Sequence, residues 1–111
     1  MQQYVYKAFV TDVYDGDTIT VNIDLGFEIW LKDQKIRLAN IDAPEVRGEN
    51  KLQGIKSRDR LRELILNKEV VVETIKDKKG KYGRWLGNIY YNTELINEKL
   101  IQEGLAETYL K

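Results

Sequence analysis

Residues 14–25 read YDGDTITVNIDL and join a turn signal directly to an alternating strand. The turn, Asp-Gly-Asp at 15–17, combines acidic turn formers with a glycine whose backbone is permissive, which is typical of a hairpin. After the turn, Ile19, Val21 and Ile23 alternate with polar residues, which is the period of a strand with one buried face. This stretch therefore predicts a fold built mainly from strands.

The rest of the chain divides into segments with strand or helix periodicity. Strands are predicted at 4–10, 18–25, 36–40, 70–75 and 86–91, and helices at 51–67 and 94–103. A polar turn is expected at 32–35, Thr93 is expected to cap the second helix, and Gly104 to end it. Five main strands with a helix after the third predict an α+β, mainly β fold, a five-stranded barrel of the oligonucleotide-binding (OB) type with two to three helices.

Length and composition set limits on the chemistry. The 111 residues predict one domain spanning 1–111. Eighteen basic side chains balance 18 acidic ones, so attraction to a polyanion must come from local patches or from a bound cation. Histidine and cysteine are both absent. Their absence excludes Ser-His-Asp hydrolases, histidine zinc sites and thiolate chemistry, so acid–base work falls to Asp, Glu, Lys, Tyr or metal-bound water.

The sequence contains few signals for the cellular location or the oligomeric state of the protein. No apolar run approaches the length of a membrane helix, so no membrane partner is expected. Residues 1–7 lack the basic and apolar pattern of a signal peptide, which leaves a secreted mature form and a cytoplasmic protein both open. Nothing in the sequence argues for an oligomer, and a monomer is expected.

Two acidic motifs offer oxygen ligands for a hard cation. In the first, Asp17 is expected to direct its carboxylate across the barrel, with Asp15 as a supporting charge or only a turn residue. In the second, Asp-Ala-Pro-Glu at 42–45, a rigid proline turn holds two carboxylates and the Ala43 carbonyl within a few residues. Oxygen donors suit Ca²⁺ or Mg²⁺ better than zinc. Taken alone, each motif is more often a hairpin turn or a strand-ending corner.

Two arginines accompany these acids. Arg37 lies five positions before Asp42, so it can share that end of the barrel. Arg84 ends the loop motif Lys-Tyr-Gly-Arg at 81–84, and arginine binds phosphate oxygens in a bidentate way that lysine cannot. Each arginine alone is more often a solvated or salt-bridged surface residue. Together, the acids and arginines favour a cation held beside a phosphate, and hence metal-assisted cleavage of a phosphodiester.

The ordered set of motifs resembles the staphylococcal nuclease (thermonuclease) family. The matching segments run nearly end to end, at 15–18, 36–38, 41–45, 82–84, 97–98 and 104–106. The resemblance implies an OB barrel with helices that binds one Ca²⁺ ion. By matching position, it implies Asp17 and Asp42 as the metal carboxylates and Ala43 as the carbonyl ligand.

The same resemblance implies roles around the substrate phosphate. Glu45 would orient or deprotonate the attacking water, and Arg37 and Arg84 would clamp the phosphate. Lys81 and Tyr82 match positions that contact a terminal phosphate of the bound nucleotide. The implied activity is Ca²⁺-dependent hydrolysis of DNA and/or RNA that leaves 3′-phosphate ends. A single-stranded or breathing substrate is expected, because a small barrel reads an unpaired strand more easily than a closed duplex.

Two other interpretations stay open. The chain could be a catalytically silent, nuclease-like module that binds nucleic acid, or a protein-interaction domain on the same barrel, because a fold alone never determines function. Silent modules of the family usually lose an acid or an arginine, and all five of these residues are present here, which favours the enzyme: Asp17, Arg37, Asp42, Glu45 and Arg84. The loop after Glu45, residues 46–49, is shorter than in the best-known secreted member, which bears on affinity and substrate preference.

Overall fold

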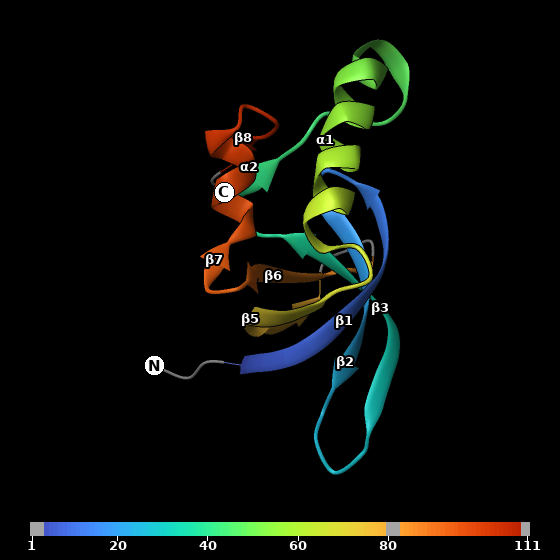
Figure 1. Ribbon diagram of the computed structural model, residues 1–111, viewed down its shortest axis with the longest axis vertical. Coiled ribbons are helices and arrows are strands. Elements are labelled where there is room, and N and C mark those ends of the chain that lie inside the picture. Colours follow the sequence, from blue (N-terminus) through green and yellow to red (C-terminus); the bar gives the residue numbers. More distant parts are fainter. Residues whose placement is uncertain (1–3, 80–82, 110–111) are drawn as a thin grey trace.

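A closed β-barrel forms the centre of the molecule (Figure 1). The computed structural model describes residues 4–79 and 83–109. Within these residues the barrel strands are β1 (Tyr4–Asp15), β2 (Thr18–Asp24), β3 (Trp30–Leu38), β5 (Glu69–Lys79) and β6 (Trp85–Tyr91). They pair antiparallel in the order β3-β2-β1-β5-β6, and a parallel pairing of β3 with β6 closes the barrel. The predicted α+β, mainly β, OB-type barrel is therefore confirmed.

Shorter elements surround the barrel. They are β4 (Ile41–Asp42), the 3₁₀ turn η1 (Gly48–Asn50), α1 (Lys51–Ile65), β7 (Glu94–Leu95), α2 (Ile96–Gln102) and β8 (Glu107–Thr108). β4 pairs with β8, and β7 pairs with β6. Figure 1 shows both helices toward one end of the molecule and the β2–β3 hairpin projecting at the other. Among the described residues, neither helix has the length and apolar character that crossing a membrane requires.

The alternation in β2 directs one face into the core. Ile19 and Val21 are completely buried and Ile23 nearly so, whereas Thr20 and Asn22 between them are partly exposed. Successive side chains of a strand point to opposite faces, so this alternation separates a buried face from an outer face. The outer face carries the candidate site.

The α1 helix packs against the barrel through small and apolar residues. Gly54, Ser57, Leu61 and Ile65 are buried and recur at the three- and four-residue spacing of one helical face. Two of these residues are small, so the first half of the helix approaches its neighbours closely. It can therefore support the loops that carry the acidic motifs.

The polar turn expected at 32–35 is wrong. These residues belong to β3, which pairs with β2 as far as Trp30 opposite Asp24. A register shift and a left-handed φ of 57° at Asp33 mark a bulge in β3, and the Asp33 N–H donates to the Asn22 side-chain oxygen at 3.0 Å. Cross-strand pairing overrides the local polar composition, so the hairpin is longer than predicted.

The predicted helix cap at Thr93 is also wrong. Thr93 has a left-handed φ of 66° in the turn between β6 and β7, and residues 94–95 pair with β6. The α2 helix begins at Ile96, with Leu95 in the N-cap position. Gly104 has the predicted left-handed conformation, with φ of 75°, shortly after α2 ends.

Asn97 ties α2 to the barrel beside the site. It is buried; its side-chain oxygen accepts the Ile89 N–H at 3.0 Å, and its amide donates to the Ala39 carbonyl at 2.9 Å. A buried amide with its donors and acceptors paired holds one arrangement of the chain. The segment that connects β3 to β4, and so leads to Asp42, is thereby fixed in place.

Candidate active site

The Asp-Gly-Asp-Thr turn between β1 and β2 sits against α1 and the second acidic loop. The turn is closed locally by the Asp17 N–H, which donates to a carboxylate oxygen of Asp15 at 3.1 Å. A Cβ atom placed on Gly16 would lie 2.7 Å from the Ala43 Cβ and 2.8 Å from the Ser57 Cβ. Such approaches are too close for any side chain, so glycine is required here to bring the two acidic motifs together.

Asp17 is a buried carboxylate at the centre of the site. Only 5% of the residue is exposed. One carboxylate oxygen accepts the Ala43 N–H at 2.9 Å, and the other accepts the Thr18 hydroxyl at 3.2 Å. The Oδ2 atom also lies 3.5 Å from a guanidinium nitrogen of Arg37. Buried charges need such partners, and these contacts hold the carboxylate in one orientation.

Arg37 connects the two acidic motifs. Its Nη2 lies 3.5 Å from Asp17 and 3.3 Å from Asp42, while Nη1 donates to the carbonyls of Leu38 and Ile41 at 3.1 and 3.0 Å. The guanidinium also lies 5.6 Å from the centroid of the Tyr109 ring, a cation–π distance. The side chain is thus held by several contacts between the acids.

Gly54 of α1 holds the loop that carries Glu45. A Cβ atom at Gly54 would overlap the Glu45 carbonyl and lie 2.8 Å from the Val46 nitrogen. The backbone of this loop therefore lies directly on the helix. The Glu45 side chain itself is exposed, so the loop presents a carboxylate to solvent from a rigid support.

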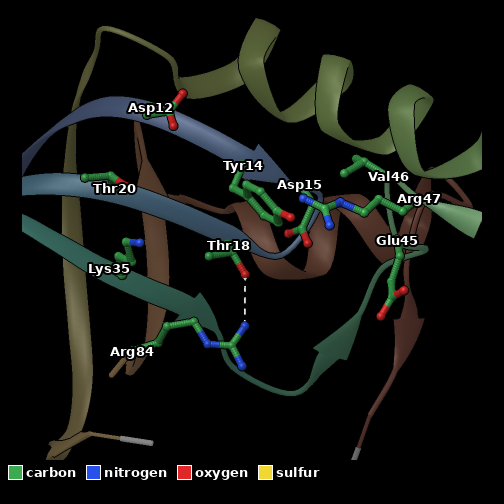
Figure 2. Close-up of a pocket in the computed structure, with 10 residues that line it drawn as sticks. All are labelled: Asp12, Tyr14, Asp15, Thr18, Thr20, Lys35, Glu45, Val46, Arg47 and Arg84. Carbon is green, nitrogen blue, oxygen red and sulfur yellow. Dashed lines mark hydrogen bonds between the residues drawn. The ribbon is translucent and has the colours of Figure 1, made fainter. Parts of the chain in front are cut away.

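A groove of about 600 Å³ opens on the outer face of β2, beside this loop. Figure 2 shows Glu45 and Arg47 at one end, Thr20 and Lys35 at the other, and Arg84 across from the loop. Arg84 donates to the Thr18 hydroxyl at 3.3 Å. Because the same hydroxyl bonds to Asp17, Arg84 is linked to the buried carboxylate through one side chain.

Electrostatics in the groove are unusual at Asp15. Burial, with the adjacent Asp17 carboxyl as a second cause, raises the pKa of Asp15 to about 7. Two carboxyls this close disfavour the state in which both are ionised. A cation beside them would oppose this rise, because it favours the charged forms.

The structure brings most of the predicted site residues together, but around two hollows. Asp15, Glu45 and Arg84 line the groove, whereas Asp42 and Ala43 line a neighbouring pocket of about 400 Å³. Asp17 and Arg37 join the two sets through the contacts described above. Lys81 and Tyr82, predicted to contact nucleic acid, lie outside the described residues.

The donor atoms suit a hard cation, although few of them converge. Asp17 and Asp42 both contact Nη2 of Arg37, so the space between them already attracts positive charge. Across residues 4–79 and 83–109, no group of three or more acidic side chains is close enough to hold a metal ion. An ion here would depend on the two carboxylates, the Ala43 carbonyl and water or substrate oxygens.

Sequence reasoning missed several groove residues. Thr18 links Arg84 to Asp17, while Lys35 and Arg47 add positive charge to the lining. Thr18 is the last residue of the first motif and Arg47 lies two positions after Glu45, so their place in the sequence was a usable signal. Lys35 was assigned to a turn, and only its pairing with Thr20 places it in the groove.

The fold and the site together define a class of protein, an OB barrel on which one arginine joins two acids beside a groove. The family described as "Staphylococcal nuclease homologue" matches residues 35–111. The chain belongs to this staphylococcal nuclease family. The match begins at Lys35, after the Asp-Gly-Asp-Thr turn, so the first acidic motif lies outside it.

Comparison with individual proteins extends the similarity to the first motif. The chain is 37% identical over 107 residues to a thermonuclease of Staphylococcus hyicus, an alignment covering 94% of this chain and 59% of the relative. It is 34% identical over 100 residues to a thermonuclease of Staphylococcus intermedius, covering 87% and 56%. A micrococcal nuclease of Shigella flexneri is 34% identical over 113 residues, covering 94% and 59%. The chain thus spans less than two thirds of the length of these relatives.

Proposed function

We propose that this protein is a nuclease that hydrolyses phosphodiester bonds in DNA and/or RNA. The observation that carries the proposal is a continuous set of contacts from Arg84 through Thr18 and Asp17 to Arg37. It places two guanidiniums around one buried carboxylate at the edge of a groove. The relatives named thermonuclease and micrococcal nuclease support the same reading.

We further propose one Ca²⁺ ion, held by the carboxylates of Asp17 and Asp42 and the carbonyl of Ala43. When bound, the ion would supply positive charge that offsets repulsion between these acids and a phosphodiester. The guanidinium of Arg37 now meets both acids, and it would turn toward substrate phosphate once another cation is present.

The remaining steps fall to the protein's own side chains. Glu45, exposed at the end of the groove, orients a water molecule and accepts its proton as the water attacks phosphorus. Arg37 and Arg84 donate to the phosphoryl oxygens, whose negative charge grows as the five-coordinate state forms. The bond from phosphorus to the 5′-oxygen breaks, the 5′-oxygen takes up a proton from solvent to become a hydroxyl, and the other product ends in a 3′-phosphate. Lys81 and Tyr82 contact a terminal phosphate of the nucleotide.

A cleavage assay tests this function directly. Heat-denatured DNA and RNA are incubated with Ca²⁺, with Mg²⁺ and with chelator. We expect cleavage in Ca²⁺, none in chelator, and slower cleavage in Mg²⁺, because Mg²⁺ demands strict octahedral geometry from a site with few protein ligands. Release of phosphate from the products by a phosphatase specific for 3′ ends checks the position of bond breakage.

A negative result in the cleavage assay would point to a different function. Failure to cleave under any condition, together with measurable binding of single strands, would identify a binding module instead. The contact of Arg37 with both acids is compatible with that alternative, because the guanidinium then offsets part of their negative charge without a metal ion.

Replacing Gly54 by alanine is expected to lower kcat by up to about 100-fold, because a small misplacement of a catalytic group has effects of this size. The new Cβ would push the Glu45 carbonyl and move the loop. Alanine has the higher helix propensity, which offsets part of any loss in stability. Steady-state kinetics and thermal denaturation measure the two effects.

Leu52→Ala is the matched control, since Leu52 is 82% exposed on the same helix and lines neither the groove nor the pocket beside Asp42. We expect it to keep the original kcat. A Gly54→Ala protein with unchanged kcat would show that α1 does not position Glu45.

A further inference from the structure

The outer face of the β2–β3 hairpin continues beyond the groove. Thr18, Thr20 and Asp24 alternate along one face of β2 and pair with Arg37, Lys35 and Trp30 of β3. Directly paired residues of antiparallel strands share a face, so Trp30 lies on the same face as the two groove cations.

The β1 strand adds two residues to this face. Phe9 pairs with Asn22, and Lys7 pairs with Asp24, on the side of β2 away from β3. We call the surface formed by Lys7, Phe9, Thr20, Asn22, Trp30 and Lys35 the outer-face strip. Phe9 is 38% exposed and Trp30 is 48% exposed, whereas Ile23 on the opposite face is 5% exposed. The strip thus presents two aromatic rings and two lysines to solvent.

These ring positions suit a particular type of ligand. The strand 2–3 face of OB barrels is a general surface for oligonucleotides. Single strands bind where a basic groove leads to aromatic side chains on which bases stack. Here the groove leads along β2 toward Trp30 and Phe9. Its lining is of mixed charge, with three cations that can contact phosphates and three acids: Lys35, Arg47 and Arg84, with Asp12, Asp15 and Glu45.

We propose that a single strand of nucleic acid leaves the groove along the outer-face strip and stacks bases on Trp30 and Phe9. This inference rests on the proposed function, because it assumes that the groove holds the scissile phosphate. From Thr18 to Asp24 a strand rises about 20 Å, at roughly 3.3 Å per residue. That length suits an added stretch of several nucleotides, within the roughly 4–16 that one OB barrel accommodates.

The charge of the outer-face strip indicates how it would contribute to the binding of nucleic acid. Lys7 and Lys35 are offset by Asp24 and by Asp12, which pairs with Thr20. The strip is therefore close to neutral, and stacking rather than phosphate pairing supplies its share of binding. Its effect should depend little on salt, in contrast to contacts made by groove cations.

The test compares oligothymidylates of 4 and 12 nucleotides, bound without Ca²⁺ so that they remain intact and cleaved with Ca²⁺. Trp30→Ala and Phe9→Ala should each raise Kd for the 12-mer about fivefold, which corresponds to the lower limit of base stacking, and leave the 4-mer unchanged. The loss should persist at higher salt. Trp30→Phe should retain most of the affinity, because it keeps a ring. Binding of the 12-mer should quench the tryptophan fluorescence of the original protein more than that of Trp30→Phe.

The matched control is Phe27→Ala. Phe27 is 96% exposed in the loop between β2 and β3, outside the strip, so its removal should leave both affinities unchanged. If Phe27→Ala weakens 12-mer binding as much as Trp30→Ala does, the hairpin binds nucleic acid nonspecifically through its exposed apolar side chains, and the strip proposal is wrong.

The remaining outcomes test the outer-face strip as a binding surface and the nuclease activity independently of each other. Normal cleavage with no length-dependent loss in Trp30→Ala or Phe9→Ala would overturn the strip and leave the nuclease standing. Length-dependent binding lost in these variants, with no cleavage by the original protein, would support the strip and overturn the nuclease. Concentration-dependent dimerisation abolished by Trp30→Ala, without any change in 12-mer binding, would assign this surface to a second copy and overturn the proposal.

Discussion

Glu45→Gln is expected to lower kcat by about 10²- to 10⁴-fold, the range that general acid–base groups contribute. Glutamine keeps the size and polarity of the side chain but cannot accept a proton from water. The side chain is exposed at the end of the groove, so the substitution should leave the fold unchanged. Steady-state kinetics on denatured DNA, with calcium affinity from calorimetry, separates turnover from binding.

Glu49→Gln provides the matched control, because Glu49 is an exposed glutamate of the same loop in η1. It should cleave at the original rate. If Glu45→Gln also cleaves at that rate, another group activates the water. If instead its loss is entirely in calcium affinity, Glu45 belongs to the ion-binding set.

The barrel could be predicted because its signals are local. Ile19, Val21 and Ile23 alternate within a single strand, and their burial follows from the two-residue period alone. The extension of β3 to Trp30 could not be predicted in this way. It depends on pairing with Asp24 across a bulge at Asp33, and such pairing is decided by tertiary context.

The candidate site shows the same difference between local sequence signals and tertiary contacts. The acids at 15–17 and 42–45 could be singled out because each motif is continuous in sequence. The close approach of Gly54 to Glu45, and of the Arg37 guanidinium to Tyr109, joins residues from different elements. The hydrophobic periodicity of a sequence does not predict contacts between different elements. The residues that hold the site in shape can therefore be identified only from the folded structure.

Asp17→Asn is expected to weaken Ca²⁺ binding by at least about 100-fold, since losing even an outer-shell partner of a metal costs about 10- to 100-fold. Asparagine removes the charge, yet its oxygen can still accept the Ala43 N–H that Asp17 accepts at 2.9 Å. Stability in chelator should therefore be retained. Calorimetric titration with Ca²⁺ and thermal unfolding with and without the ion measure the two effects.

Two comparisons make this result specific to the buried charge. Asp17→Ala should show the same loss of Ca²⁺ binding and also unfold more easily in chelator, by about 1–3 kcal/mol, because it leaves the buried Ala43 N–H without its acceptor. Asp42→Ala should weaken Ca²⁺ binding with little change in stability, since that carboxylate is 58% exposed. If Asp17→Asn binds Ca²⁺ as tightly as the original protein, the ligand assignment is wrong. Asp17 would then serve to hold Arg37 and the two acidic turns together.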